Sequence, residues 1–113
     1  MLVLNRFVVA EDAAAPFVTR AHAALAALAA CPGYRAGRLT RALDEPEHWC
    51  LVTEWESVGT YRRALGSYDV KVDATPLLAE SLDEPSAYET LAAAEPGGEV
   101  LTSPSDRAAR PWR

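Results

Sequence analysis

The stretch LVLNRFVV, residues 2–9, constrains the fold more than any other part of the sequence. Its β-branched and aromatic residues are typical of a β-strand. Apolar side chains fall on both alternating faces: Leu2, Leu4 and Val8 on one, and Val3, Phe7 and Val9 on the other. A strand that is apolar on both sides must be covered on both sides. We therefore expect a central strand with one layer above it and another below it.

A helix is predicted over residues 12–30, where apolar residues recur at helical spacing. Asp12 is the expected N-cap, and Pro16 falls in the first turns, where proline is tolerated. The apolar stripe consists of Phe17, Ala21, Ala24, Leu25 and Leu28. The tripeptide CPG, residues 31–33, should end the helix, because proline cannot continue it and glycine permits a left-handed exit.

Two strands should follow, at residues 34–43 and 48–55, joined by the turn DEPE into an antiparallel hairpin. Ser57 is a suitable cap for the next helix, in which Val58, Tyr61 and Leu65 share one side. Gly66 and Ser67 interrupt this helix, a second helical piece covers about residues 69–81, and a last strand covers residues 86–93. The order β-α-β-β-α-β predicts an α+β, ferredoxin-like fold with a four-stranded antiparallel sheet and two helices on one face.

The 113 residues, half of them hydrophobic, suffice for one domain, which we place at residues 1–92. Residues 93–113, rich in Pro, Gly, Ser and charge, are predicted to form a tail without regular structure, in which Val100, Leu101 and Trp112 could dock on a partner surface. Because two helices cover only one face of such a sheet, the other apolar face needs a cover of its own. A second copy of the sheet is the simplest one, so we predict a homodimer.

The charge pattern argues against several classes of partner. The net charge is −5, and the eleven Lys and Arg residues are scattered, so neither nucleic acid nor an anionic membrane is expected to bind. No stretch approaches the ~20 apolar residues of a membrane span, and the first residues show neither a leading positive charge nor a cleavage site. We expect a cytoplasmic protein. No His or Cys residue lies near Cys31 or Cys50 in a zinc-binding spacing, so no metal site is predicted. In the cytoplasm both thiols should be reduced.

The segments PGYRAGRL, LVTEWESVGTY, TPLL and LDEPSAYETL together resemble the antibiotic biosynthesis monooxygenase (ABM) family over residues 1 to about 92. The resemblance implies a dimeric α+β barrel. The family includes cofactor-free oxygenases of polycyclic phenols, haem-degrading enzymes, isomerases of small metabolites and members without known activity, so the fold alone does not set the function.

In the cofactor-free oxygenases the pocket stabilises a substrate anion and excludes water. The resemblance places Trp55 and Tyr61 at that family's pocket tryptophan and tyrosine, whereas Leu51 stands where an asparagine is expected. For haem degradation, Asn5 fits the pattern. Ala64 and Asp73 replace the tryptophan and the histidine ligand, which argues against that activity.

The residues themselves leave alternatives open. Trp49, Leu51, Thr53 and Trp55 share one strand face, so Trp55 and Tyr61 either surround a ligand or pack only on each other. Asn5, disfavoured in a buried strand, either bonds the backbone or points into a polar cavity where it holds a substrate oxygen. His22 is the candidate general base, although a surface role is the commoner one.

We expect further substrate contacts from Phe7, Arg38, Leu51, Leu65 and Tyr68. Tyr68 lies in the helix break, which could open to admit substrate. The favoured hypothesis is a monooxygenase without metal or other cofactor that oxidises a hydrophobic, aromatic or polyketide-type small molecule with O2. The alternatives are a non-catalytic dimeric ligand-binding or accessory protein, a small-metabolite isomerase, and a haem-degrading enzyme.

Overall fold

A computed structural model describes residues 1–105 and 107. The main sheet has four antiparallel strands in the spatial order β2-β3-β1-β4, formed by Leu2–Val8 (β1), Tyr34–Arg41 (β2), His48–Trp55 (β3) and Ala87–Tyr88 (β4). This is the predicted ferredoxin-like arrangement. Strand β1 pairs with β3 along its whole length, so Asn5 lies opposite Leu51 and Phe7 lies opposite Trp49.

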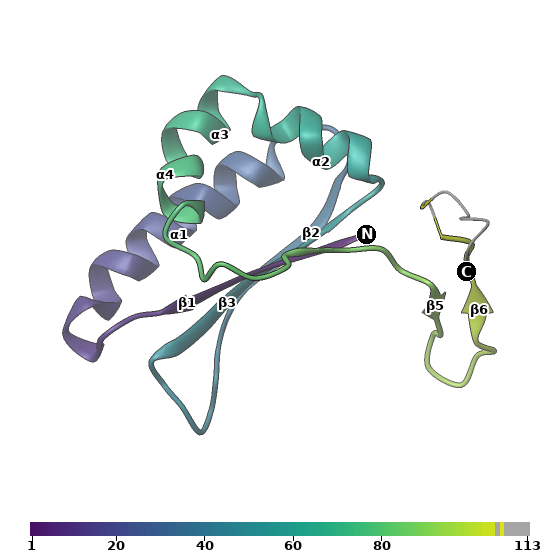
Figure 1. The fold of residues 1–113 in the computed structure, drawn as a ribbon, viewed down its shortest axis with the longest axis horizontal. Coiled ribbons are helices and arrows are strands. Elements are labelled where there is room, and N and C mark those ends of the chain that lie inside the picture. Colours follow the sequence, from purple (N-terminus) through teal and green to yellow (C-terminus); the bar gives the residue numbers. More distant parts are fainter. Residues whose placement is uncertain (106, 108–113) are drawn as a thin grey trace, which may run out of the picture.

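All the helices lie on one side of the sheet (Figure 1). They are α1 (Ala14–Ala29), α2 (Val58–Leu65), α3 (Tyr68–Asp73) and α4 (Thr75–Leu78), and a short 3₁₀ turn, Glu11–Ala13, precedes α1. Helix α1 buries its predicted stripe against the sheet, with Leu25 at the margin. The expected cap of this helix was wrong. The N-cap is Ala13, with no side-chain hydrogen bond, because the 3₁₀ turn already contains Asp12.

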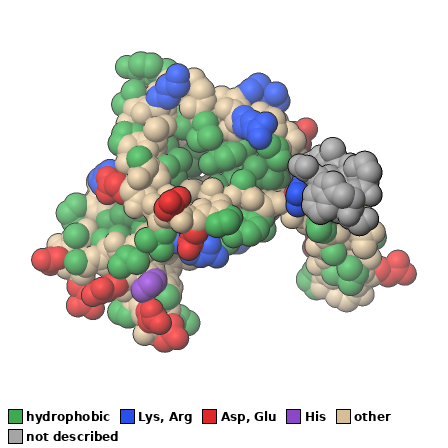
Figure 2. Space-filling model, viewed as in Figure 1, with side chains coloured by type: hydrophobic (Ala, Val, Ile, Leu, Met, Phe, Trp, Pro, Cys, Tyr) green, Lys and Arg blue, Asp and Glu red, His purple; other side chains and the backbone are tan. Residues whose placement is uncertain are grey.

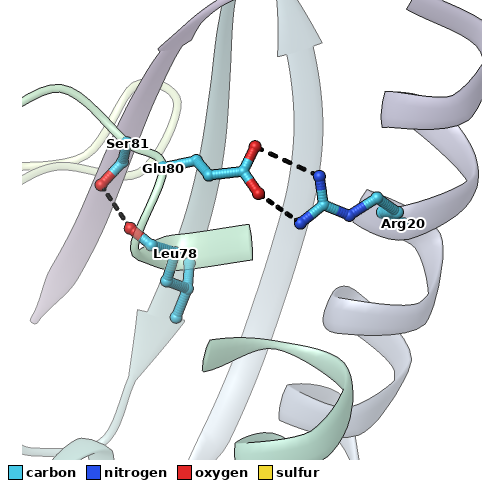
Figure 3. Close-up of polar contacts among 4 residues, drawn as sticks. All are labelled: Arg20, Leu78, Glu80 and Ser81. Atoms are coloured by element: carbon cyan, nitrogen blue, oxygen red, sulfur yellow. Dashed lines mark hydrogen bonds and ion pairs between the residues drawn. The ribbon is translucent and has the colours of Figure 1, made fainter. Parts of the chain in front are cut away.

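The second helical region differs from the prediction of one piece over residues 69–81. Helix α3 ends at Asp73, and a separate α4 begins at Thr75. Pro76 explains the break, since it has no N–H to donate to the preceding turn and its ring clashes with that turn. Arg20 of α1 holds the end of this region through two hydrogen bonds to Glu80, at 3.2 and 2.5 Å, and the Ser81 hydroxyl donates to the Leu78 carbonyl at 2.7 Å (Figure 3).

The last strand is much shorter than residues 86–93. Only Ala87–Tyr88 pairs with β1, although two further backbone bonds, from Leu4 N–H to Ser86 and from Leu82 N–H to Arg6, run alongside it. Pro85 lies between these bonds and has no N–H for the ladder, which limits the strand. Ala92–Ala93 (β5) instead pairs with Leu101–Thr102 (β6) in a separate ladder beside the body (Figure 1). The expectation that the tail lacks regular structure was therefore wrong for β6. Of the expected docking residues, Val100 and Leu101 are exposed, and Trp112 lies outside the described residues.

The two faces of the main sheet have different environments. The face toward the helices carries the core, with Val3, Leu51 and Trp55 each 0% exposed. On the other face Leu2 and Val8 are 36% and 52% exposed, and Leu4 and Val52 are half-buried. No element among residues 1–105 and 107 covers this second face. In the same part of the chain, no helix is long and apolar enough to cross a bilayer.

Candidate active site

Trp55 lies at the end of β3 and is fully enclosed on the helix side of the sheet. Its indole N–H donates to Thr53 Oγ1 at 2.8 Å, a bond between side chains two residues apart on one strand face. Its ring packs edge-on against Tyr34, with 5.4 Å between centroids, and tilted against Tyr61, also at 5.4 Å. Trp55 and Tyr61 thus meet as predicted, and the polar atom of the indole is already satisfied within the protein.

Helix α2 brings Tyr61 to this position, and its first turn explains how. Ser57 Oγ accepts from the Thr60 N–H at 3.1 Å, while Thr60 Oγ1 accepts from the Ser57 N–H at 3.2 Å. This reciprocal capping box confirms Ser57 as the cap. Burial raises the pKa of Tyr61 above its ordinary value. Its side chain is therefore a neutral phenol near neutral pH.

Asn5 is a polar side chain in an apolar setting. It is 9% exposed, on the same face as Val3 and Phe7, and directly opposite Leu51 across the β1–β3 ladder. Its amide makes no hydrogen bond to any residue in the described part of the chain, and its polar atoms keep some access to water. A mostly enclosed amide without a protein partner is open to water or to a ligand oxygen, so its free donor and acceptor suit a binding role.

An aromatic row continues from Asn5 toward the hairpin end of the sheet. Phe7 and Phe17 lie 5.1 Å apart between ring centroids, and Phe17 and Trp49 lie 5.4 Å apart. The Arg41 guanidinium carbon lies 4.9 Å above the Trp49 ring, within cation–π range. Trp49 is 9% exposed, and its Nε1 is the one buried side-chain polar atom without a partner among the described residues. Sequence reasoning placed Trp49 on this face but gave it no role, because the pattern of a strand does not distinguish a satisfied indole from an unsatisfied one.

Three predicted site residues lie away from this group. His22 is exposed on the outward side of α1. Arg38 is exposed on the uncovered sheet face, since it pairs with Val52 rather than with a helix-facing residue. Tyr68 is 78% exposed at the start of α3. Leu51, by contrast, is completely enclosed, and Leu65 is half-buried beside the core.

Two cavities lie next to the start of α2. One of about 620 Å³ is bordered by the end of β4, and another of about 570 Å³ extends toward β5. Both are lined by Met1, Ser57, Val58 and Glu89. Neither is lined by Asn5, Trp55 or Tyr61, so the candidate residues face the interior between sheet and helices. Figure 2 shows hydrophobic side chains gathered over the helices and the segment that follows them.

A smaller cavity of about 330 Å³ lies at the hairpin end, on the β2–β3 side of the sheet. Its lining includes Arg41, Trp49 and Cys50. Burial raises the pKa of the Cys50 thiol, an effect that nearby Arg6 opposes. Cys31 and Cys50 are free thiols, and the described residues contain no cluster of three or more His, Cys, Asp or Glu side chains arranged for a metal.

Several solved structures share the fold of this chain. SnoaB, a cofactor-independent oxygenase from Streptomyces nogalater, is 25% identical, with 97% of this chain and 95% of SnoaB covered and a TM-score of 0.63. The protein Rv0793 from Mycobacterium tuberculosis is 22% identical over 96% of this chain and 97% of its own, with a TM-score of 0.61. A conserved protein from Methanosarcina mazei Go1 is 21% identical over 76% and 84%, with a TM-score of 0.63.

No curated protein sequence matches the chain. The family model for antibiotic biosynthesis monooxygenases matches residues 1–72, which carry β1, the hairpin, the Ser57 cap and the paired Trp55 and Tyr61 rings. With this match and the four-stranded sheet, the chain belongs to the antibiotic biosynthesis monooxygenase family.

Proposed function

We propose that this protein is a cofactor-independent monooxygenase that oxidises a hydrophobic, aromatic small molecule with O2 in the cytoplasm. Family membership and the similarity to SnoaB support a reaction of this type. The proposed substrate is a phenol or anthrone-like compound with an acidic position, whose anion supplies the electrons itself. Oxidation of a CH2 group to a carbonyl consumes one O2, places one oxygen atom in the product and releases the other as water.

Asn5 carries this proposal. Its amide is nine-tenths buried, has no protein partner in the described part of the chain, and lies on the helix-facing side of the sheet. An amide N–H in a water-poor interior is well suited to hold a phenolate or enolate oxygen, because a preorganised donor there stabilises charge more than it would in water. Asn5 would orient the substrate and stabilise its anion.

Trp55 and Tyr61 have a different proposed role from the polar one that the family pattern suggests. The Trp55 N–H is already bonded to Thr53, and Tyr61 is held neutral by burial. These residues would form one wall of the substrate space and exclude water from it, with Leu51, Phe7 and Leu65 as apolar neighbours. His22 faces outward and is not part of the proposed proton path. The substrate anion would form by loss of a proton to solvent before binding.

The uncovered sheet face supports a homodimer. Leu2, Leu4 and Val52 lie together on this face, Arg6 separates them from Val8, and Arg38 lies beside Val52 in the register. An apolar surface of this kind on a small folded domain marks an association site, and a second copy of the same sheet would bury it symmetrically. In the proposed dimer, Arg38 would contact the other copy rather than the substrate.

The packing of Leu51 and Trp55 supports a second candidate function, a non-catalytic ligand-binding protein of the same fold. Leu51 fills, at 0% exposure, the position where an asparagine is expected, and Trp55 is satisfied internally. On this view Asn5 would hold a ligand oxygen without any oxidation following.

Oxygen consumption distinguishes the two functions. A panel of dihydroxynaphthalenes and hydroxyanthrones should give enzyme-dependent O2 uptake with a carbonyl product. Asn5→Ala should reduce the rate by about 10²-fold, the scale for losing one oxyanion donor. Leu51→Asn, which places a second amide opposite Asn5, should retain or increase the rate. Binding of the panel without O2 uptake would favour the ligand-binding function, and uptake unchanged in Asn5→Ala would refute the role of Asn5.

A further inference from the structure

The indole of Trp49 presents an unsatisfied hydrogen-bond donor in the core. Its Nε1 is buried and has no partner among the described residues, whereas the corresponding atom of Trp55 is bonded to Thr53 at 2.8 Å. Buried N–H groups in native proteins are almost always paired, so a single exception requires an explanation. One explanation is that the Trp49 N–H donates to an oxygen atom of a bound ligand.

The position of Trp49 relative to Asn5 favours that explanation. Asn5 lies opposite Leu51, and Trp49 lies opposite Phe7, so Asn5 and Trp49 are diagonal neighbours on the helix-facing side of the β1–β3 ladder. Diagonal pairs have Cα atoms roughly 7–8 Å apart, a gap that one oxygen atom can bridge between an indole and an amide. Two side chains, each nine-tenths buried and each without a partner, therefore lie next to each other.

The surroundings of Trp49 fit an aromatic ligand. Phe7, Phe17 and Trp49 form a continuous row of tilted rings, and Arg41 lies over the Trp49 ring. Trp49 also borders the cavity of about 330 Å³ at the hairpin end, while its N–H edge is closed from that cavity. The N–H thus belongs to the interior, where Asn5 also lies.

We propose that Trp49 is a substrate-binding residue whose indole N–H, together with the Asn5 amide, holds the oxygen of an aromatic alcohol or its anion. This inference rests on the proposed function only in placing the binding site at Asn5. It requires that an aromatic ligand binds there, and it does not require that the ligand is oxidised. The Trp49 N–H would serve as the second hydrogen-bond donor, which Leu51 cannot provide because its side chain has no polar atom. The apolar row beside the two donors would receive the aromatic ring.

Indole N–H resonances of the ¹⁵N-labelled full chain test the inference directly, with 2-naphthol as the probe and naphthalene as its oxygen-free counterpart. The Trp49 resonance is assigned by its loss in Trp49→Phe. Saturating 2-naphthol should move the Trp49 N–H downfield, because a new acceptor deshields it, and naphthalene should not. The Trp55 resonance is an internal control, since its N–H already has a partner.

Dissociation constants give the second readout. The preference for 2-naphthol over naphthalene should fall about tenfold in Trp49→Phe, the effect of one lost hydrogen bond to a buried donor. It should stay unchanged in Tyr88→Phe, which removes the hydroxyl of a 42% exposed aromatic residue on β4, away from the proposed site. Comparing a ratio removes the effect of lost ring contact, which weakens both ligands alike. Should Trp49→Phe fail to fold, Asn5→Ala should reduce the same ratio.

Several results would overturn the proposal: no binding of 2-naphthol at millimolar concentration, a Trp49 resonance that does not move at saturation, or an unchanged preference in Trp49→Phe. A Trp49 shift produced by Asn5→Ala without ligand would also contradict it, because the two side chains would then bond each other. If Trp49→Phe loses the preference for 2-naphthol but the wild type takes up no O2, the inference about Trp49 holds and the oxygenase function is refuted. If the wild type takes up O2 but Trp49→Phe keeps the preference, the oxygenase function holds and the inference about Trp49 is refuted.

Discussion

Replacing Asn5 with leucine should stabilise the fold and abolish the proposed O2 uptake. Asparagine and leucine share a γ-branched shape, so the substitution mainly exchanges two polar atoms for methyl groups. In the folded protein the Asn5 amide is 9% exposed and has no partner among the described residues. Because its polar atoms keep some access to water, leaving this amide without a protein partner costs about 1 kcal/mol, the lower end of the range for buried polar groups. The leucine removes that cost and buries more apolar surface, and both effects stabilise the fold. Overpacking opposes them, because forcing extra volume into a core costs about 1–3 kcal/mol.

We expect a net gain of about 1 kcal/mol in the free energy of unfolding, or a rise of about 3–6 °C in Tm for a domain of this size. Thr53→Val is the matched control, because it is also a polar-to-apolar change of similar shape on the helix-facing side of the neighbouring strand. Thr53 is 2% exposed, and its hydroxyl accepts the Trp55 N–H. Losing that acceptor leaves a fully enclosed donor unpaired and should cost about 1–3 kcal/mol.

Urea unfolding at two protein concentrations measures both variants, since association would make the midpoint depend on concentration. The predicted result is opposite signs for Asn5→Leu and Thr53→Val, with O2 uptake lost in the first. A loss of more than about 1 kcal/mol in Asn5→Leu, with an unchanged m-value, would show that the native amide is bonded. The argument for a polar binding position at Asn5 would then fail.

Three further predictions concern the turn after α1, the uncovered sheet face and the tyrosine of the site. Gly33→Ala should cost about 2–4 kcal/mol in urea unfolding, because residue 33 has φ +87° and a Cβ there would clash with the Thr60 side chain of α2. Gly97→Ala, at φ +72° with open space around it, should cost only about 1 kcal/mol. Val52→Asp should convert the proposed dimer to a monomer in sedimentation, whereas Val72→Asp, at a 53% exposed position on α3, should leave association unchanged. Burial raises the folded-state pKa of Tyr61 above 10.0, so the stability that the neutral phenol contributes is complete below pH 10 and is lost as the pH rises through the folded-state pKa. Tyr61→Phe should therefore flatten the alkaline decline of the urea midpoint. An equally steep decline in this variant would contradict the prediction.

Much of the fold follows from local patterns. The two-sided strand at residues 2–8, the hairpin and the Ser57 cap each rest on short-range chemistry: alternation, turn residues and a side chain that reaches its own helix. The pattern was less reliable where proline intervenes. Pro76 separates α3 from α4, and Pro85 limits β4 to two residues, because a missing N–H weakens an element that propensity alone would extend.

In the candidate site, too, some positions follow from periodicity and others depend on packing. Alternation along β1 and β3 is enough to place Asn5, Leu51 and Trp55 on one face, and helical spacing is enough to bring Tyr61 toward Trp55. Periodicity could not orient His22, which lies at the flank of an apolar stripe and turns outward. A flank position on a helix is compatible with either environment, so only the packed neighbours decide between them.

By itself, the sequence determined the order of the main-sheet strands and the helices between them, the alternating faces of strands β1 and β3, and an open apolar face that needs a cover. Only the tertiary structure decided which polar atoms find partners: the Trp55 N–H meets Thr53, while Asn5 and the Trp49 N–H meet none of the described residues. The physical reason is that alternation along a strand is set by backbone geometry, which is local. Hydrogen-bond satisfaction in a core depends on the rotamers and close contacts of side chains brought together from distant parts of the chain.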